Sequence, residues 1–334
     1  MSGRGTFIVS LDFELNWGVH DVFTIEQYGE HIKGVRTAIP SMLALFEQYE
    51  IHATWATVGM LCFKDKEELI KYFPAILPTY GNESFSPYTK LHTVGENEET
   101  DPYHFGQSLV LQILQVPHQE IGTHTFSHYY CLEKGQKAEQ FQADLQASLN
   151  VPCFQPHTIR SLVFPRNQLN ANYLTICKQL GIEAYRGNEE HTIYEATGYN
   201  DRSKVKRGIR LLDAYINITG HHTYQLQQDQ DNVPVNVRAS RFLRPYHPTL
   251  KFAEPLRLKR IKKGIEHAAK HGEVYHLWWH PHNFGTHVNE NLSFLQKILA
   301  HVSEMKEKYG LQSKTMGEAA SSITQNGTKN KNPQ

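Results

Sequence analysis

Two histidines, His124 and His128, lie four residues apart directly after a run typical of a β-strand. If that segment forms one turn of helix, residues i and i+4 share a face. Two imidazoles so placed can hold one divalent metal ion and leave its other positions open. Because the chain has 20 histidines, such a pair can also arise by chance. The spacing alone therefore leaves open both a metal site and an unrelated pair.

Two carboxylates, Asp12 and Glu14, close the first apolar run of the chain. Side chains alternate along a strand, so both carboxylates can face the same way, with Phe13 between them facing the other. Carboxylates near a core need a partner, which a metal ion or a cationic side chain supplies. The alternative is a helix cap or a pair at the surface.

Late in the chain, His280 ends a second apolar run and is followed by His282. A histidine at a strand end can act as a general acid when its pKa lies near the working pH. The alternative for either residue is a histidine of the core or rim held by hydrogen bonds, and we favour that alternative for His282.

Short β-rich runs alternate with helical runs along the chain. The predicted strands are 6–15, 52–61, 120–127, 161–165, 183–186 and 274–280. The predicted helices are one that begins at Pro40, three over 64–76, 138–149 and 173–180, and one along the apolar stripe 292–305. This order predicts an α/β fold with a parallel sheet covered by helices, and at this length an open or closed barrel. Functional residues of such folds lie where strands end.

The composition of the 334 residues is that of a globular protein, with 40% hydrophobic residues and a formal net charge of zero. Extensive disorder is excluded, and no general affinity for nucleic acid or an anionic membrane is expected. No membrane span is expected, because no apolar stretch is long enough. The first apolar run is too short for a signal sequence. The four cysteines of the chain form no C-x-x-C pair, so we expect reduced core thiols and a cytoplasmic protein.

Together these segments resemble the polysaccharide deacetylases of carbohydrate esterase family four, from about Phe7 to Ala320. The most specific match is Gly-Thr-His-Thr-Phe-Ser-His at 122–128, which is similar to the family's Gly-(Ser/Asn)-His-Thr-x-x-His motif. The run at 53–59 resembles the family's second strand, Leu-Trp-Trp-His at 277–280 its late histidine motif, and 315–319 its usual end. The resemblance implies a distorted, partial (β/α) barrel in one domain over 1–320. Insertions are expected at about 78–106 and at 221–239, and the first of these is either a lid or a plain surface loop. A flexible polar tail is expected at 321–334.

The resemblance also implies roles for individual residues. Asp12 matches the general base, His124 and His128 match two metal ligands, and His280 matches the residue that protonates the leaving amine. The family usually binds zinc, so one divalent metal, Zn²⁺, is the expected cofactor.

Two departures from the family pattern concern the site. The family's second aspartate, a metal ligand, is Phe13 here, and Glu14 is the nearby carboxylate that can replace it. In place of Arg-x-Pro-x-Gly the chain has Phe-Pro-Arg-Asn-Gln at 164–168. Arg166 is the first candidate to orient Asp12 and lower its pKa, and Arg186 is the second. Asn167 is a candidate to line a sugar site.

The expected reaction is hydrolysis of an N-acyl group, in the first instance N-acetyl, from an amino sugar or glycan intermediate, which can be nucleotide- or lipid-linked. Trp17 and Trp279 are candidates to contact the sugar, whereas Trp55 and Trp278 are assigned to the core. The basic run 257–263 is interpreted as a solvated helix face. Two alternatives stay open: a hydrolase of another amide, such as a ureide or formamide, and a catalytically silent carbohydrate-binding protein.

Overall fold

The computed structural model describes residues 4–195 and 204–329. Its strands are β1 (Thr6–Phe13), β2 (Ala53–Thr57), β3 (Gln119–Thr123), β4 (Ser161–Val163), β5 (Ala184–Arg186), β6 (Val235–Asn236), β7 (Arg241–Phe242), β8 (Val274–Trp279) and β9 (Gln312–Lys314). Its α-helices are α1 (Ile25–Lys33), α2 (Val35–Gln48), α3 (Lys66–Lys71), α4 (Gln107–Gln115), α5 (Ala138–Leu149), α6 (Leu174–Gln179), α7 (Lys204–Asp213), α8 (Glu254–His271), α9 (Val288–Tyr309) and α10 (Met316–Lys329).

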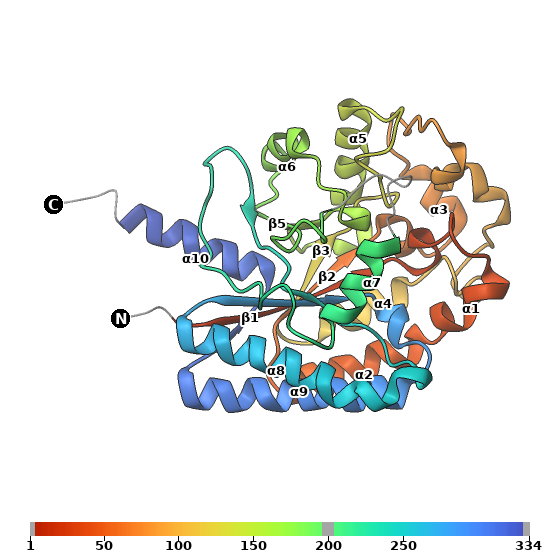
Figure 1. Ribbon diagram of the computed structural model, residues 1–334. Coiled ribbons are helices and arrows are strands. Elements are labelled where there is room, and N and C mark those ends of the chain that lie inside the picture. The colour runs from red at the N-terminus through yellow and green to blue at the C-terminus, as the bar shows by residue number, and fades with distance from the viewer. Residues whose placement is uncertain (1–3, 196–203, 330–334) are drawn as a thin grey trace.

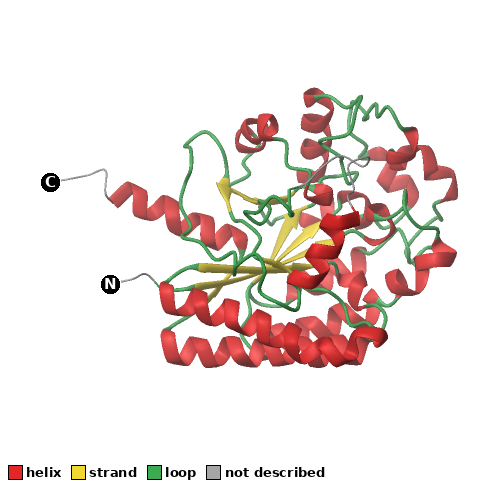
Figure 2. Ribbon diagram, in the orientation of Figure 1, coloured by secondary structure: helices red, strands yellow, loops and turns green. Residues whose placement is uncertain are grey.

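The strands form one parallel sheet in the order β6-β5-β4-β3-β2-β1-β8-β7, with β9 pairing the start of β1. The sheet curls into a half-barrel, and the helices lie around it (Figure 1). Figure 2 shows the strands fanning out at the centre, between the helices. The predicted α/β partial barrel is therefore confirmed.

The central strand β1 is buried on both faces because helices cover the sheet on both sides. It pairs with β2 and β8, and α8, α9 and α2 pack together along one side. Strands covered on both faces are nearly continuous apolar runs, as the sequence of β1 is. The carboxyl ends of the parallel strands therefore meet at one edge, where the polar residues that follow them converge.

Several predicted elements are shorter in the structure, α5 has its predicted bounds, α9 is longer than its predicted stripe, and one helix start is misplaced. Pro40 is the sixth residue of α2 and not its first. A proline inside a helix removes one backbone hydrogen bond, here the one to the carbonyl of Arg36. The apolar stripe of α2, which includes Ile39 and Met42, is buried on either side of it. That burial outweighs the lost hydrogen bond.

The ends of the chain and its cysteines complete the comparison with the predicted organisation. Helix α10 continues to Lys329, so most of the expected tail is helical, and residues 330–334 lie outside the described residues. The four cysteines are free thiols, three of them buried and Cys153 half-buried. In the described part of the chain, no helix combines the length and the apolar character that a membrane crossing needs.

Candidate metal centre and active site

The end of β1 brings Asp12 and Glu14 to the same side of the strand, as the alternation predicts. Both carboxylates are buried, and Phe13 between them packs into the main hydrophobic core. The chain then turns sharply, and a Cβ atom on Gly18 would overlap the carboxylate of Glu14. A glycine is therefore needed at position 18 to leave room for the Glu14 side chain.

Arg186, at the end of β5, holds Asp12 in a bidentate ion pair. Its two terminal nitrogens lie 2.6 and 2.7 Å from Oδ1 and Oδ2 of Asp12, and it also donates to Ser10 Oγ and Asn167 Oδ1. The guanidinium lies over the ring of Trp278, with 4.1 Å to the centroid. Burial alone would raise the pKa of Asp12, but the charge and hydrogen bonds of Arg186, together with His124 and His280, hold the pKa below its ordinary value. Asp12 is therefore ionised at neutral pH.

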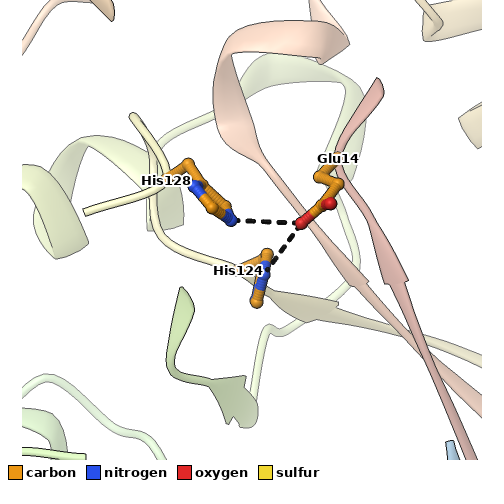
Figure 3. A group of neighbouring side chains, drawn as sticks. All are labelled: Glu14, His124 and His128. Carbon is orange, nitrogen blue, oxygen red and sulfur yellow. Dashed lines mark ion pairs between the residues drawn. The ribbon is translucent and has the colours of Figure 1, made fainter. Parts of the chain in front are cut away.

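Glu14, His124 and His128 form a buried cluster (Figure 3). Glu14 Oε2 lies 3.1 Å from Nε2 of His128 and 3.4 Å from Nε2 of His124. One ligand atom from each of the three residues lies within 4.8 Å of the others. Two imidazoles and a carboxylate are a donor set that suits zinc and other divalent transition metals.

The protonation pattern of His124 fits a bound cation. Its Nδ1 lies 2.8 Å from the carbonyl oxygen of Val163, which can only accept, so Nδ1 carries the hydrogen. Nε2 of the neutral ring is then an acceptor that faces an acceptor oxygen of Glu14 and has no hydrogen-bond partner. Either a proton or a metal ion must lie between these two atoms. A backbone carbonyl on the second nitrogen is the usual support of a metal-binding histidine.

His128 is also suited to bind a metal ion. Burial lowers the pKa of its imidazole to about 4, so the ring is neutral at pH 7 and binds a metal without first losing a proton. These observations show that the three side chains fit a metal ion and leave its identity open.

The segment that carries the two histidines is neither a helical turn nor a continuation of the predicted strand, because β3 ends at Thr123 and a loop follows. Thr125 and His128 adopt positive φ angles of 63° and 56°. The backbone of His124 donates to the carbonyl of Thr57 at the end of β2. The i, i+4 spacing therefore brings the imidazoles together through a tight loop tied to the neighbouring strand.

Asp144 of α5, which could not be identified from the sequence, fixes this loop by hydrogen bonds. Its Oδ1 accepts from the backbone N–H groups of Phe126, at 2.8 Å, and Ser127, at 3.4 Å, and its Oδ2 accepts from the Ser127 hydroxyl. Burial raises the pKa of Asp144 to about 6 against these three donors. Nothing in the sequence near α5 marks this aspartate, because its partners are mostly backbone groups.

Replacing Asp144 by alanine is expected to destabilise the fold by about 2–3 kcal/mol, because buried N–H groups would lose their acceptor. Denaturant unfolding would measure the loss. Asp144→Asn is the matched control, since its amide keeps an acceptor for the backbone and offers a donor to Ser127. Equal stabilities of the alanine and asparagine variants would contradict this supporting role.

His280 follows β8 and faces both carboxylates. Its Nε2 lies 3.7 Å from Asp12 Oδ2 and 3.7 Å from Glu14 Oε1, and the side chain is partly exposed. His282 stacks against it at 5.0 Å and is buried, with Nδ1 at 3.9 Å from Glu14 Oε1. Burial lowers the pKa of His282 to about 3, which keeps it neutral. The structure thus brings both late histidines to the carboxylates of β1.

Of the two candidate arginines, Arg186 is the one that reaches Asp12. Arg166 instead pairs with Asp21, at 2.5–2.6 Å, and lies over the ring of Tyr130. Asn167 lies at the site, where it accepts from Arg186. From the sequence, Arg166 ranked first because it lies within the 164–168 segment that replaces the family's arginine motif. The contact of Arg186 with Asp12 joins β5 to β1 and depends on the curl of the sheet.

Two tryptophans offered as sugar contacts are core residues. Trp17 is buried and donates to the carbonyl of His104, and Trp279 is buried against Phe46 and Phe284. Neither ring is open to a ligand. Trp278, assigned to the core from sequence, has its face on Arg186. Trp278 is buried, as that assignment expects, and alternation along β8 turns its side chain, and not that of Trp279, toward the site.

Comparison with known proteins bears on the fold and the family. The sequence profile of the polysaccharide deacetylase family matches residues 30–185, a stretch that includes His124 and His128 but not Asp12, Glu14 or His280. None of the curated proteins matches the chain.

Several solved structures share the fold. A putative polysaccharide deacetylase from Mycobacterium smegmatis superimposes with a TM-score of 0.60 at 12% identity, covering 97% of this chain and 92% of that one. PuuE allantoinase gives 0.53 at 9% identity, with 95% and 88% covered. The 4-alpha-glucanotransferase from Thermococcus litoralis gives 0.55 at 11% identity and covers 96% of this chain, which spans 41% of that enzyme. Identities this low establish the fold alone, and the fold accommodates more than one reaction.

Proposed function

Because the chain is a divergent member of the polysaccharide deacetylase family, we propose that it hydrolyses an N-acyl group, in the first instance N-acetyl, from an amino sugar or glycan intermediate. The observation that carries the proposal is the convergence of Asp12, His280 and the Glu14/His124/His128 cluster at one edge of the sheet. Amide hydrolysis needs a nucleophile, stabilisation of an oxyanion and a proton for the departing nitrogen. This edge holds groups suited to each need.

The proposed cofactor is Zn²⁺, held by Glu14, His124 and His128. When bound, it supplies a Lewis acid for the acyl carbonyl and lowers the pKa of water. In this chain Glu14 stands in for the aspartate that the family has at the position of Phe13. The side chain of Glu is one carbon longer, and Gly18 leaves it the room it needs.

Asp12 is the proposed general base. Arg186 keeps it ionised and fixes the plane of its carboxylate. Each carboxylate oxygen has two lone pairs, so a bidentate arginine leaves one on each oxygen to accept a proton from the attacking water.

His280 is the proposed general acid, which gives its proton to the departing nitrogen. It is the member of the late histidine pair that is partly exposed, so a substrate can reach it, whereas His282 is buried beneath it. Phe242 and Trp278 flank His280 at 5.9 and 5.7 Å between ring centroids. These ring contacts orient the imidazole of His280 and leave its Nε2 free of a bond to either ring.

The site of action is proposed to be the cytoplasm, in keeping with four free thiols. Arg166 and Asn167 stay proposed contacts of the substrate, whereas His282, which is buried beneath His280, does not.

The test is product release from a panel of amides: a short oligomer of N-acetylglucosamine, UDP-N-acetylglucosamine, an N-formyl amino sugar and allantoin. We expect acetate and free amine in equal amounts from an N-acetyl sugar, measured by a coupled acetate assay and an amine reagent. Turnover of allantoin or the formamide alone would replace the proposal by hydrolysis of another amide. Sugar binding by calorimetry without any turnover would replace it by a silent binding protein.

A further inference from the structure

Helix α7 turns its apolar side to solvent. Val205 and Leu212 are 71% and 56% exposed, and Ile209, which lies between them on the same helix face, is half-buried. Asp213 of the same helix is fully buried. An amphipathic helix at the surface of a globular protein normally does the reverse, with its apolar stripe against the core.

Asp213, the last residue of α7, holds the helix to the protein. Asp213 pairs with Arg241, at 2.8 Å, accepts from Tyr194 and caps the backbone of Ile218 and Thr219. Both partners of the ion pair are buried, so the contact is strongly specified. The helix is fixed by charge, and its outward face is left with aliphatic side chains.

The start of α8 extends this face. Arg260 of α8 lies 3.7 Å from Oδ1 of Asp213, the last residue of α7, so the end of α7 lies beside α8. Phe252 and Leu256 there are 77% and 52% exposed. We call the combined face the α7–α8 surface; its exposed apolar members are Val205, Leu211, Leu212, Ile216, Ile218, Phe252 and Leu256.

These residues are not a random sample of the surface. Among the large apolar side chains in the described part of the chain, the six most exposed all belong to the α7–α8 surface. Apolar side chains scattered singly need no explanation, whereas a cluster marks a binding face.

The exposed charges on the α7–α8 surface are positive. Arg207, Lys251, Lys259 and Lys263 are exposed. The acidic residues within 205–219 and 248–263 are Asp213 and Glu254, and each is paired with an arginine. The basic run expected as a solvated helix face therefore divides, with Lys259 and Lys263 outward and Arg257 and Arg260 buried.

We propose that the α7–α8 surface docks on an anionic phospholipid interface. Aliphatic and aromatic side chains beside lysines and arginines are the composition of a peripheral membrane contact, in which the apolar groups enter the headgroup boundary and the cations meet lipid phosphates. A symmetric contact with a second copy would place like charges against one another. Protein interfaces are also depleted in lysine, which this face presents three times.

The position of this surface relates it to the candidate active site. Asp213 binds Arg241, and the next residue of β7, Phe242, packs against His280. Strand β7 therefore connects the buried end of α7 to His280, which faces Asp12 and Glu14. The inference rests on α7 and α8 and does not depend on the proposed reaction.

The test is co-sedimentation of the full chain with vesicles of phosphatidylcholine mixed with phosphatidylglycerol, and with vesicles of phosphatidylcholine alone. We expect binding to the mixed vesicles that weakens in high salt. The double variant Leu212→Ser/Phe252→Ser is expected to bind at least about tenfold more weakly, because two apolar side chains no longer enter the interface. Lys259→Glu should lower binding about fivefold or more, since each cation contributes about 1 kcal/mol near an anionic surface.

The matched control is Ile70→Ser/Leu111→Ser, which removes two exposed apolar side chains from α3 and α4. It should bind vesicles as the wild type does. No binding to the mixed vesicles, or equal binding by wild type and the Leu212/Phe252 variant, would overturn the proposal. A dimer seen by light scattering for the wild type and not for the Leu212/Phe252 variant would also overturn it, because the surface would then join two copies. Binding of an acidic protein in place of lipid would overturn it as well.

Discussion

Replacing Glu14 by glutamine is expected to lower the affinity of the protein for Zn²⁺ about a hundredfold or more. Changes to groups that merely support metal ligands already cost about 10–100-fold, and glutamine removes the one negative charge from the cluster. Its neutral amide is nearly isosteric with the carboxylate and fits beside Gly18, so the fold should be retained. Elemental analysis after extensive dialysis, together with a competition titration against a chromophoric chelator, would measure the loss.

The control for this experiment is Glu67→Gln, the same substitution on a glutamate of α3 whose side chain is 82% exposed. That variant should keep about one metal ion per chain, as the wild type should. Unchanged affinity in Glu14→Gln would remove Glu14 as a ligand. A wild-type protein that holds no metal and takes up none on addition would remove the metal from the proposed function altogether.

Replacing Asp12 by asparagine is expected to lower turnover of an N-acetyl substrate about 10²–10⁴-fold, the usual contribution of a general base. Metal content should be unchanged, because the substitution leaves Glu14, His124 and His128 in place. Initial rates of acetate release, divided by the folded fraction from circular dichroism, would measure the effect on the chemistry alone.

The folded fraction matters because Asp12→Asn leaves Arg186 buried without its counter-ion, which costs up to about 3–5 kcal/mol. The chain offers a control, since Asp213 and Arg241 form a second buried Asp–Arg ion pair that does not involve Asp12 or Glu14. Asp213→Asn should lose comparable stability and keep its turnover of a water-soluble substrate. If both variants lost turnover equally, or if Asp12→Asn kept it, Asp12 would not be the base.

The parts of the site that follow from local pattern could be predicted from the sequence. The alternation over Asp12-Phe13-Glu14 gave two carboxylates on one face because a strand has a fixed period. The repeated strand–helix order placed His124, Arg186 and His280 at strand ends, where a parallel sheet gathers them.

What could not be predicted depends on contacts between distant segments. The choice of Arg186 over Arg166 for Asp12 requires the curl of the sheet, and the support of the histidine loop by Asp144 requires the packing of α5. The spacing of His124 and His128 also could not reveal their backbone conformation. Side chains four residues apart can meet on a helix, and they also meet in the tight loop that these two histidines occupy. Trp278 and Trp279 differ by one residue, and only the phase of β8 decides which faces the site.

The ion pair between Arg186 and Asp12 also connects two strands across the concave face of the half-barrel. Strands β5 and β1 are not neighbours, because β4, β3 and β2 lie between them in the sheet. A side chain can span that interval only on the concave side of a bent surface. The curvature of the sheet and the charge of Asp12 are thus linked: any motion that flattens the sheet separates the pair and leaves a lone buried carboxylate.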